Sequence, residues 1–203
     1  MTQARRLVLA SGSPARRRML ADAGLDFEVV PAVIDEDGLR DRMLAEAADA
    51  PHAEIARALA VAKARDVSSR RPGARVIGSD QILSTGSGML SKPATLDDAR
   101  ATLKALRGRT HWLHSAVALV EDGETIWSAV DTASLTMHAV SDSCLERYLD
   151  AAGDAILGCV GAYQIEGTGV RLFDAVEGNH WTILGMPLLP LLSELRRLKE
   201  IDV

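Results

Sequence analysis

A strand, a turn and a helix follow one another in residues 6–24, RLVLASGSPARRRMLADAG. The apolar run at residues 6–10 has the composition of a short buried strand. Ser13 is a good helix N-cap, Pro14 suits the first helical position, and Gly24 suits the position just after a helix end. The stretch therefore predicts a strand that leads through a serine-rich turn into a helix, which favours an α/β fold.

The rest of the chain continues this alternation of strands and helices. A hairpin is predicted at Asp122-Gly123, between strands at 110–120 and 125–140. Because both hairpin and crossover connections occur, we expect an α/β fold with a mixed sheet. The remaining predicted strands cover 27–35 and 76–83, the second with an interruption; the helices cover 52–69, 95–108, 141–153 and 186–201; a loop covers 36–51; and a glycine-rich stretch leads to residues 169–176.

Composition limits the class of protein. The chain has 203 residues and a net charge of −5, so we expect one domain over residues 1–203 and no nucleic-acid partner. Two cysteines, Cys144 and Cys159, are too few for a disulfide framework and predict reduced thiols. The longest apolar run, ILGMPLLPLL at 183–192, is about half of a membrane span, so we expect a cytoplasmic protein with no membrane partner.

One apolar run contains a carboxylate. In VIGSDQILS, residues 76–84, Asp80 interrupts what is otherwise a buried strand. A buried carboxylate costs several kcal/mol unless it is paired, hydrogen-bonded or bound to a metal. Two interpretations stay open: Asp80 caps a turn between two short strands, or it lies at a strand end and faces a metal or a water.

Basic and acidic side chains give weaker signals. The Ser-Gly-Ser turn at 11–13, followed by Arg16, suits a phosphate at a helix N-terminus, or is only a capped helix with a solvated basic face. Lys63 continues an apolar helical stripe and either extends to solvent or has a function. The acidic run at 35–37 is typical of a solvated loop, and Lys92 carries no signal of its own.

Together, the motifs and their order resemble the Maf proteins, nucleoside triphosphate pyrophosphatases that are also called septum-formation proteins. The resemblance covers nearly the whole chain, and several blocks in the right order make it specific. The blocks that carry it are LVLASGSPARRRMLADAG (7–24), IDE (34–36), AVAKA (60–64), VIGSDQIL (76–83), SKPATLDDARATLKALRGRTHWLHSAVAL (91–119) and GAYQIEGTGVRLFDAVEGNHWTILGMPL (161–188).

The resemblance implies a two-lobed α/β fold with an elongated, curved sheet and a cleft between the lobes. It implies hydrolysis of a nucleoside triphosphate to the monophosphate and pyrophosphate with a divalent metal, Mg²⁺ or Mn²⁺, and it suggests a homodimer. Asp80 matches the catalytic base and, with Glu36, the metal-associated positions. The positions that match phosphate binding are Ser11, Ser13, Arg16, Lys63 and Lys92. Such a cluster of cations suits a triphosphate, which carries about four negative charges.

Three positions of the family are associated with the choice of base, and here they are Ala15, Gln81 and Glu166. The subgroup acting on dTTP and UTP has Arg, Thr and Gln there, and the subgroup acting on 7-methyl-GTP has Trp, Gln and Glu. The chain matches the second subgroup at Gln81 and Glu166. A carboxylate such as Glu166 pairs well with guanine N1–H and N2–H. The departure at Ala15 removes an aromatic stacking partner and leaves a broader base preference open.

Three other interpretations compete with a pyrophosphatase. A non-catalytic regulator of cell division would bind nucleotides without turnover. A different phosphohydrolase would release phosphate rather than pyrophosphate. A plain structural α/β domain would leave the basic residues scattered in space.

Overall fold

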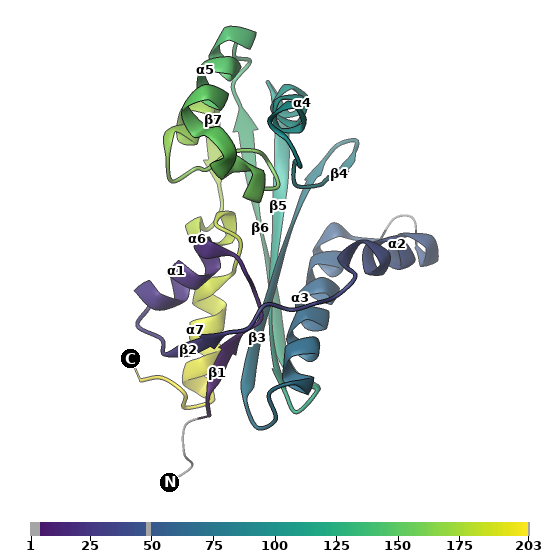
Figure 1. The fold of residues 1–203 in the computed structure, drawn as a ribbon, viewed down its shortest axis with the longest axis vertical. Coiled ribbons are helices and arrows are strands. Elements are labelled where there is room, and N and C mark those ends of the chain that lie inside the picture. Colours follow the sequence, from purple (N-terminus) through teal and green to yellow (C-terminus); the bar gives the residue numbers. More distant parts are fainter. Residues whose placement is uncertain (1–4, 48–49, 203) are drawn as a thin grey trace. The chain divides into compact units, whose positions relative to one another are not determined.

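The computed structural model describes residues 5–47 and 50–202, and within them the chain forms helices around a seven-stranded sheet (Figure 1). The strand order is β2-β1-β3-β5-β6-β7, and β4 also pairs with β3. β1 is parallel to β2 and β3, while the β3–β4 and β6–β7 pairs are antiparallel, which confirms the predicted mixed α/β fold. The strands are β1 Leu7–Leu9, β2 Phe27–Val29, β3 Arg75–Thr85, β4 Gly88–Leu90, β5 Thr110–Glu121, β6 Glu124–Met137 and β7 Phe173–Glu177.

The helices surround this sheet, and no helix within the described ranges combines the length and the hydrophobicity needed to cross a membrane. The α-helices are α1 Pro14–Asp22, α2 Glu36–Glu46, α3 His52–Ser69, α4 Leu96–Leu106, α5 Asp142–Ala152, α6 His180–Ile183 and α7 Leu188–Arg197, and the 3₁₀ helices are η1 Gly153–Gly158 and η2 Thr168–Leu172.

The chain forms two compact units. Unit 1 contains the described residues of Met1–Gln81, His114–Thr132 and Asn179–Val203, and unit 2 contains Ile82–Leu113 and Ala133–Gly178. The long strands β3, β5 and β6 contribute residues to both units.

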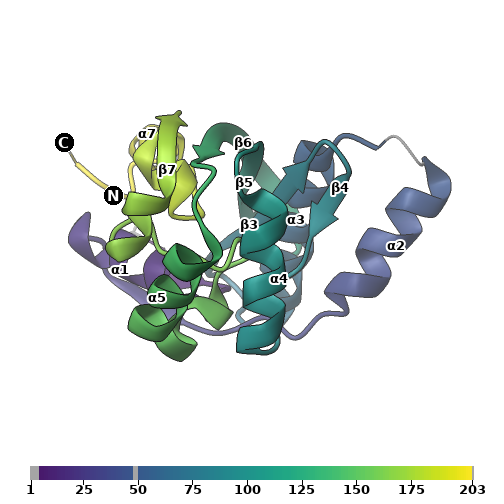
Figure 2. The same ribbon diagram turned by 90° about the horizontal axis from the view of Figure 1, so that it is seen from above.

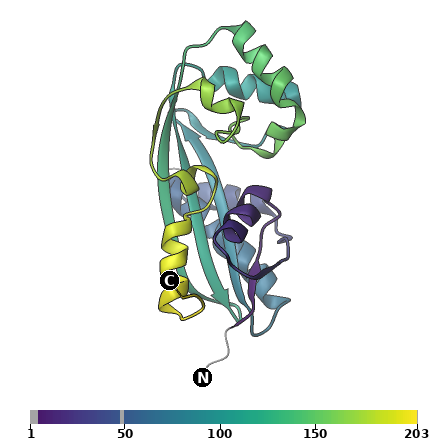
Figure 3. The same cartoon turned by 90° about the vertical axis from the view of Figure 1, so that its left-hand side faces the viewer.

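The core of unit 1 has two layers, one on each face of its strands. Successive residues of β1 point to opposite faces: Leu7 and Leu9 pack with α1 and α7, and Val8 packs with α3. Figure 1 shows α3 on one side of these strands, and Figure 3 shows α1 and α7 together on the opposite side. Both faces of β1 are therefore covered, as expected for a short parallel strand made only of apolar residues.

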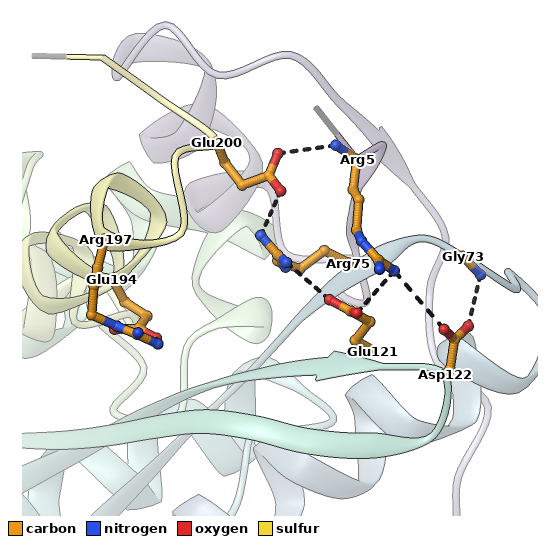
Figure 4. A network of polar contacts seen from close by, with 8 residues as sticks. All are labelled: Arg5, Gly73, Arg75, Glu121, Asp122, Glu194, Arg197 and Glu200. Atoms are coloured by element: carbon orange, nitrogen blue, oxygen red, sulfur yellow. Dashed lines mark hydrogen bonds and ion pairs between the residues drawn. The ribbon is translucent and has the colours of Figure 1, made fainter. Parts of the chain in front are cut away.

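A charged network fixes one end of unit 1 (Figure 4). The side chain of Arg75, only 8% exposed, pairs with Glu200 beyond α7 and with Glu121 at the end of β5. Arg5 reaches the same two carboxylates, through its backbone N–H to Glu200 and its guanidinium to Glu121. Arg75 thus ties the segment after α7 to the ends of β3 and β5.

Unit 2 packs helices α4 and α5 against each other (Figure 2). Thr95 caps α4 through a capping box with Asp98. The same unit contains a buried aromatic cluster, in which His111 Nε2 and the Tyr163 hydroxyl are 2.8 Å apart and Tyr163 packs edge-on against Phe173. Burial lowers the pKa of His111 to about 4.

Several predicted elements are confirmed. The helix at 52–69 is α3, and positive φ angles at Asp122 (47°) and Gly123 (84°) form the predicted hairpin turn. The predicted helix stop at Gly153 is also present, with φ of 54°.

Other predictions are wrong, each for a local reason. The strand predicted at 27–35 ends at Val29; Val30 still donates to Leu9 O, and Pro31, which lacks an N–H, cannot continue the pairing. The loop predicted at 36–51 contains α2, because Asp35 accepts a hydrogen bond from Gly38 N (2.9 Å) and acidic residues suit a first helical turn. Residues 48–49 of that loop lie outside the described residues. The interruption predicted in 76–83 is absent, since β3 is continuous.

Candidate functional site

The first part of the site is the turn between β1 and α1. Ser13 caps α1 by accepting a hydrogen bond from Arg16 N (3.4 Å), and Ser13 N donates to the hydroxyl of Ser11 (3.3 Å). Ser11 is buried and Ser13 is half-buried. Two hydroxyls therefore lie at the positive end of a nine-residue helix, which is a favourable place for an anion.

Arg16 projects back from the first turn of α1 toward this end of the helix. Its Nε donates to Gly185 O and its NH1 to Ser79 O, both at 2.9 Å, and NH1 also reaches Ser11 Oγ at 3.3 Å. Burial lowers the pKa of Arg16, and the carboxylates of Asp80 and Glu36 oppose this effect. Arg16 is therefore a fixed cation near two acidic groups.

Those acidic groups share a second cation, Lys63 of α3. Its Nζ is 2.6 Å from Asp80 Oδ1 and 2.8 Å from Glu36 Oε2. The side chains of Lys63 and Asp80 are 11% and 9% exposed, and that of Glu36 is 49% exposed. Lys63 is thus paired in the interior rather than extended to solvent. Asp80 does not cap a turn, and Glu36 begins a helix rather than lying in a loop.

Gly78 allows α3 to come this close to β3. A Cβ at Gly78 would lie 2.1 Å from Ala60 O and 2.8 Å from the Cβ of Ala64, so only glycine fits against this turn of α3. Because side chains alternate along a strand, Gly78 and Asp80 share one face of β3. The close contact at Gly78 therefore brings Lys63 within reach of Asp80.

Ser79 and Gln81 project from the opposite face of β3, toward α6 and the Gly185 that follows it. The Ser79 hydroxyl lies 2.8 Å from Ala116 O and 3.1 Å from Gly185 O. Gln81 Nε2 lies 3.0 Å from Ser115 Oγ and 3.1 Å from the carbonyls of Thr182 and Ile183. Residues 78–81 of β3 therefore alternate between two faces of the strand, and the side chains on each face have their own partners.

The third candidate specificity position, Ala15, is half-buried in the first turn of α1 and has only a methyl side chain. Lys92 and Glu166 belong to unit 2, where both are exposed. Burial raises the pKa of the Cys159 thiol, Glu166 raises it further, and Lys92 opposes the rise. Lys92 and Glu166 therefore both act on one neighbourhood of unit 2, around Cys159.

Sequence reasoning missed four residues that hold this arrangement together: Ser79, Ser115, Thr182 and Gly185. Gly185 accepts hydrogen bonds from both Arg16 and Ser79 and has a φ of 111°, a conformation that favours glycine. The burial of Ser79 within an apolar strand was a usable signal. Ser115 and Thr182 gave none, because their partners are distant in sequence.

The charges of unit 1 set what the site can bind. Arg16 and Lys63 contribute two positive charges, and Asp80 and Glu36 contribute two negative charges, so this group of four is neutral. A triphosphate with about four negative charges would be repelled by the two carboxylates unless a further cation accompanied it.

A divalent metal fits this donor set. Within the ranges 5–47 and 50–202, no group of three or more His, Cys, Asp or Glu side chains is arranged to hold a metal. Mg²⁺ does not need such a cage, since it is usually bound by one or two carboxylates together with waters and substrate phosphates. The carboxylates of Glu36 and Asp80 both pair with Lys63 Nζ and so lie close together. Their oxygens are ligands that suit a hard cation such as Mg²⁺.

Comparison with known proteins agrees with the sequence resemblance. A family model described as "Maf-like protein" matches residues 6–198. A 7-methyl-GTP pyrophosphatase of Mesorhizobium japonicum is 50% identical over 197 residues, which cover 97% of this chain and 98% of the relative. A nucleoside triphosphate pyrophosphatase of Nitrobacter winogradskyi is 53% identical over 191 residues, which cover 94% and 92%. With its motifs, its fold and these matches in agreement, the chain belongs to the Maf family.

Proposed function

We propose that this protein hydrolyses a nucleoside triphosphate between the α- and β-phosphates and releases the monophosphate and pyrophosphate. The observation that carries the proposal is the buried Asp80–Lys63 pair (2.6 Å) close to the fixed Arg16. Relatives of about half identity are named for this activity, which supports it. The family model covers both units, which supports one functional domain over residues 1–203.

Each residue has a distinct part in the reaction. The hydroxyls of Ser11 and Ser13, with Arg16 and Lys63, bind phosphate oxygens at the N-terminus of α1 and stabilise the charge that develops on them. Asp80 acts as the base: Lys63 bonds its Oδ1, and its second oxygen has no hydrogen-bond partner within the described chain. That oxygen can accept the proton of the attacking water. Lys92, a residue of unit 2, is proposed as a phosphate ligand only because it matches a phosphate-binding position of the family.

We propose that Mg²⁺ or Mn²⁺ takes part, held by Glu36 and Asp80. When bound, the cation neutralises phosphate charge and lowers the pKa of the attacking water. Lys63 lies against both carboxylates, so it keeps their negative charge balanced and orients them.

The proposed substrate is 7-methyl-GTP. The relatives from Mesorhizobium japonicum and Rhizobium meliloti carry that name, and Gln81 and Glu166 match the corresponding subgroup. The Nitrobacter winogradskyi relative has the broader name nucleoside triphosphate pyrophosphatase. Ala15 departs from the subgroup, so the alternative is a dTTP and UTP pyrophosphatase of the same family. We also propose a cytoplasmic homodimer, for which light scattering of the purified protein is the test of the dimer.

The deciding experiment measures turnover with Mg²⁺ or Mn²⁺ on 7-methyl-GTP, GTP, dTTP, UTP and CTP, with pyrophosphate and phosphate quantified separately. Asp80→Asn should lose at least about a hundredfold in kcat, as expected for loss of a general base. Asp22→Asn, at the exposed end of α1, is the matched control and should keep full activity. Full turnover of folded Asp80→Asn would remove Asp80 from the role of base.

The same panel separates the competing functions. Release of phosphate without pyrophosphate would replace the proposal with a phosphatase. Binding of nucleotides without turnover would replace it with a non-catalytic regulator.

A further inference from the structure

The orientation of the Gln81 side-chain amide is fixed by its surroundings. Nε2 lies within 3.1 Å of two backbone carbonyl oxygens, those of Thr182 and Ile183. Carbonyl oxygens only accept hydrogen bonds, so the nitrogen of the amide, and not its oxygen, must face them. The hydrogen-bonding chemistry of the neighbouring groups therefore determines which atom of the Gln81 amide is the nitrogen and which is the oxygen.

Ser115 strengthens this assignment. Its hydroxyl donates its single hydrogen to Thr182 O at 2.7 Å, so toward Gln81 Nε2, at 3.0 Å, it can only accept. Gln81 Nε2 thus faces three acceptors. Ser115 and Thr182 are fully buried, so a flipped amide would turn its oxygen against these acceptors and remove the hydrogens that Nε2 donates to them, with no water to replace them.

Thr182 is itself anchored from its other end. Its hydroxyl donates to Asp131 Oδ2 at 2.6 Å, and Asp131 Oδ1 accepts from the backbone of Thr132 at 2.9 Å. A charged acceptor makes a stronger hydrogen bond than a neutral one. The Thr182 carbonyl is therefore held in place on β6, and with it the nitrogen of Gln81.

The amide oxygen of Gln81 points away from these three acceptors, toward Gly185. Oε1 lies 3.8 Å from the position that a Cβ of Gly185 would take, and that position is 3.6 Å from the guanidinium of Arg16. Within the described residues no group donates a hydrogen bond to Oε1, and Gln81 is half-buried. Gln81 thus presents one unused acceptor next to Gly185.

We propose that Ser115, Thr182 and Asp131 are positioning residues that lock Gln81 as an acceptor toward the base of the nucleotide. The inference rests on the proposed function and deepens it. A base that meets Oε1 must offer a hydrogen, as the ring N–H of guanine, 7-methylguanine or uracil does. At the same ring position cytosine (N3) and adenine (N1) carry an acceptor, so a base that places this ring nitrogen against Oε1 is disfavoured, and only its exocyclic amino group could still donate. Such a buried polar contact discriminates more strongly than an apolar pocket does.

The test compares kcat/KM for GTP and UTP with kcat/KM for ATP and CTP. Gln81→Met should reduce this ratio by about five- to thirtyfold, as expected for one lost oriented hydrogen bond. Ser115→Ala combined with Thr182→Val should reproduce most of that reduction, because the amide can then turn. The kcat of Ser115→Ala/Thr182→Val on the best substrate should stay within about threefold, since Asp80 is untouched.

Thr125→Val is the matched control, because the Thr125 hydroxyl is buried without a hydrogen-bond partner within the described residues. It should leave the ratio unchanged. Asp131→Ala removes the acceptor of the Thr182 hydroxyl and lies at a half-buried position. It replaces Thr182→Val in the test if that variant does not fold. An equal loss of activity on all four nucleotides in the network variants would overturn the proposal and leave them a structural role only.

A second readout does not depend on catalysis. The two side-chain N–H signals of Gln81, assigned by their absence in Gln81→Met, should exchange slowly in the wild-type protein and faster in Ser115→Ala/Thr182→Val. Rapid exchange in the wild type would overturn the locked orientation. If the protein binds nucleotides without hydrolysing them, the proposed function fails. The inference about Gln81 is then tested separately, by comparing the dissociation constants for GTP and UTP with those for ATP and CTP in the wild type and the variants.

Discussion

Replacing Lys63 with methionine should destabilise the protein more than any surface substitution. Methionine keeps the length and apolar stem of lysine and removes only the ammonium, which lies 2.6 Å from Asp80 and 2.8 Å from Glu36. Asp80, with a side chain 9% exposed, would then be a buried carboxylate without its cation. The loss therefore measures how strongly the interior depends on this pair.

The magnitude follows from burial. Removing one partner of a buried ion pair costs about 3–5 kcal/mol, because the remaining charge stays desolvated. The contact with Glu36 adds about 0–1 kcal/mol, since that side chain is 49% exposed. Arg16 also acts on Asp80 and offsets part of the loss. We expect a net loss of about 3 kcal/mol, or roughly 6–12 °C in Tm for a chain of this size.

Urea denaturation followed by tryptophan fluorescence measures this loss, because Trp127 and Trp181 pack against the core of unit 1. The wild type, Lys63→Met, Asp80→Asn and the double variant form a double-mutant cycle. The double variant should be more stable than the sum of the single losses predicts, by about 1–3 kcal/mol. Glu36→Gln is the control and should cost less than about 1 kcal/mol. Additive losses, or a cost of Lys63→Met below about 1 kcal/mol, would refute the reasoning.

Three further predictions concern the scaffold. Gly78→Ala should cost about 1–3 kcal/mol in urea denaturation and lower kcat, because a Cβ there lies 2.1 Å from Ala60 O; unchanged stability would contradict the close packing. The pKa of His111 is lowered to about 4, so its contribution to stability is complete above pH 6.5 and falls by up to about 3 kcal/mol as the pH drops toward 4. His111→Phe should flatten the stability profile between those pH values, and an unchanged profile would exclude His111 as its source. Arg75→Met should cost about 3–5 kcal/mol, because the Glu200 side chain, 6% exposed, would keep only the hydrogen bond from the Arg5 backbone N–H and lose its charged partner, and Arg75→Met with Glu200→Gln should recover part of that loss in thermal unfolding.

Local chemistry made much of the fold predictable. The Asp122-Gly123 turn, the Thr95 cap and α3 each depend on residues close in sequence, and all three are present. α2 was not predicted because its acidic first turn, at Glu36 and Asp37, has the composition of a solvated loop. Whether Asp35 caps a helix or only a turn depends on the backbone that follows it.

The candidate site was predictable only in part, because its order depends on contacts distant in sequence. The resemblance pointed to Asp80, Lys63 and Arg16, but nothing in the sequence showed that Arg16 donates to Gly185, 169 residues away. The Thr182 carbonyl, which orients Gln81, is a backbone atom and has no sequence signal at all.

The continuous strand explains how the polar residues at 78–81 can remain buried in β3. β1 ends at Leu9, paired with Ile77, so the residues that follow in β3 lie beyond its carboxyl end, where α/β folds commonly bind ligands. Because side chains alternate along a strand, Gly78 and Asp80 face α3 and Lys63, while Ser79 and Gln81 face α6 and the Gly185 that follows it. In the proposed function, hydrolysis and recognition of the base thus depend on opposite faces of one strand. A shift of one residue in register would exchange the two functions, so the partners on both faces, Lys63 and Thr182, oppose that shift together.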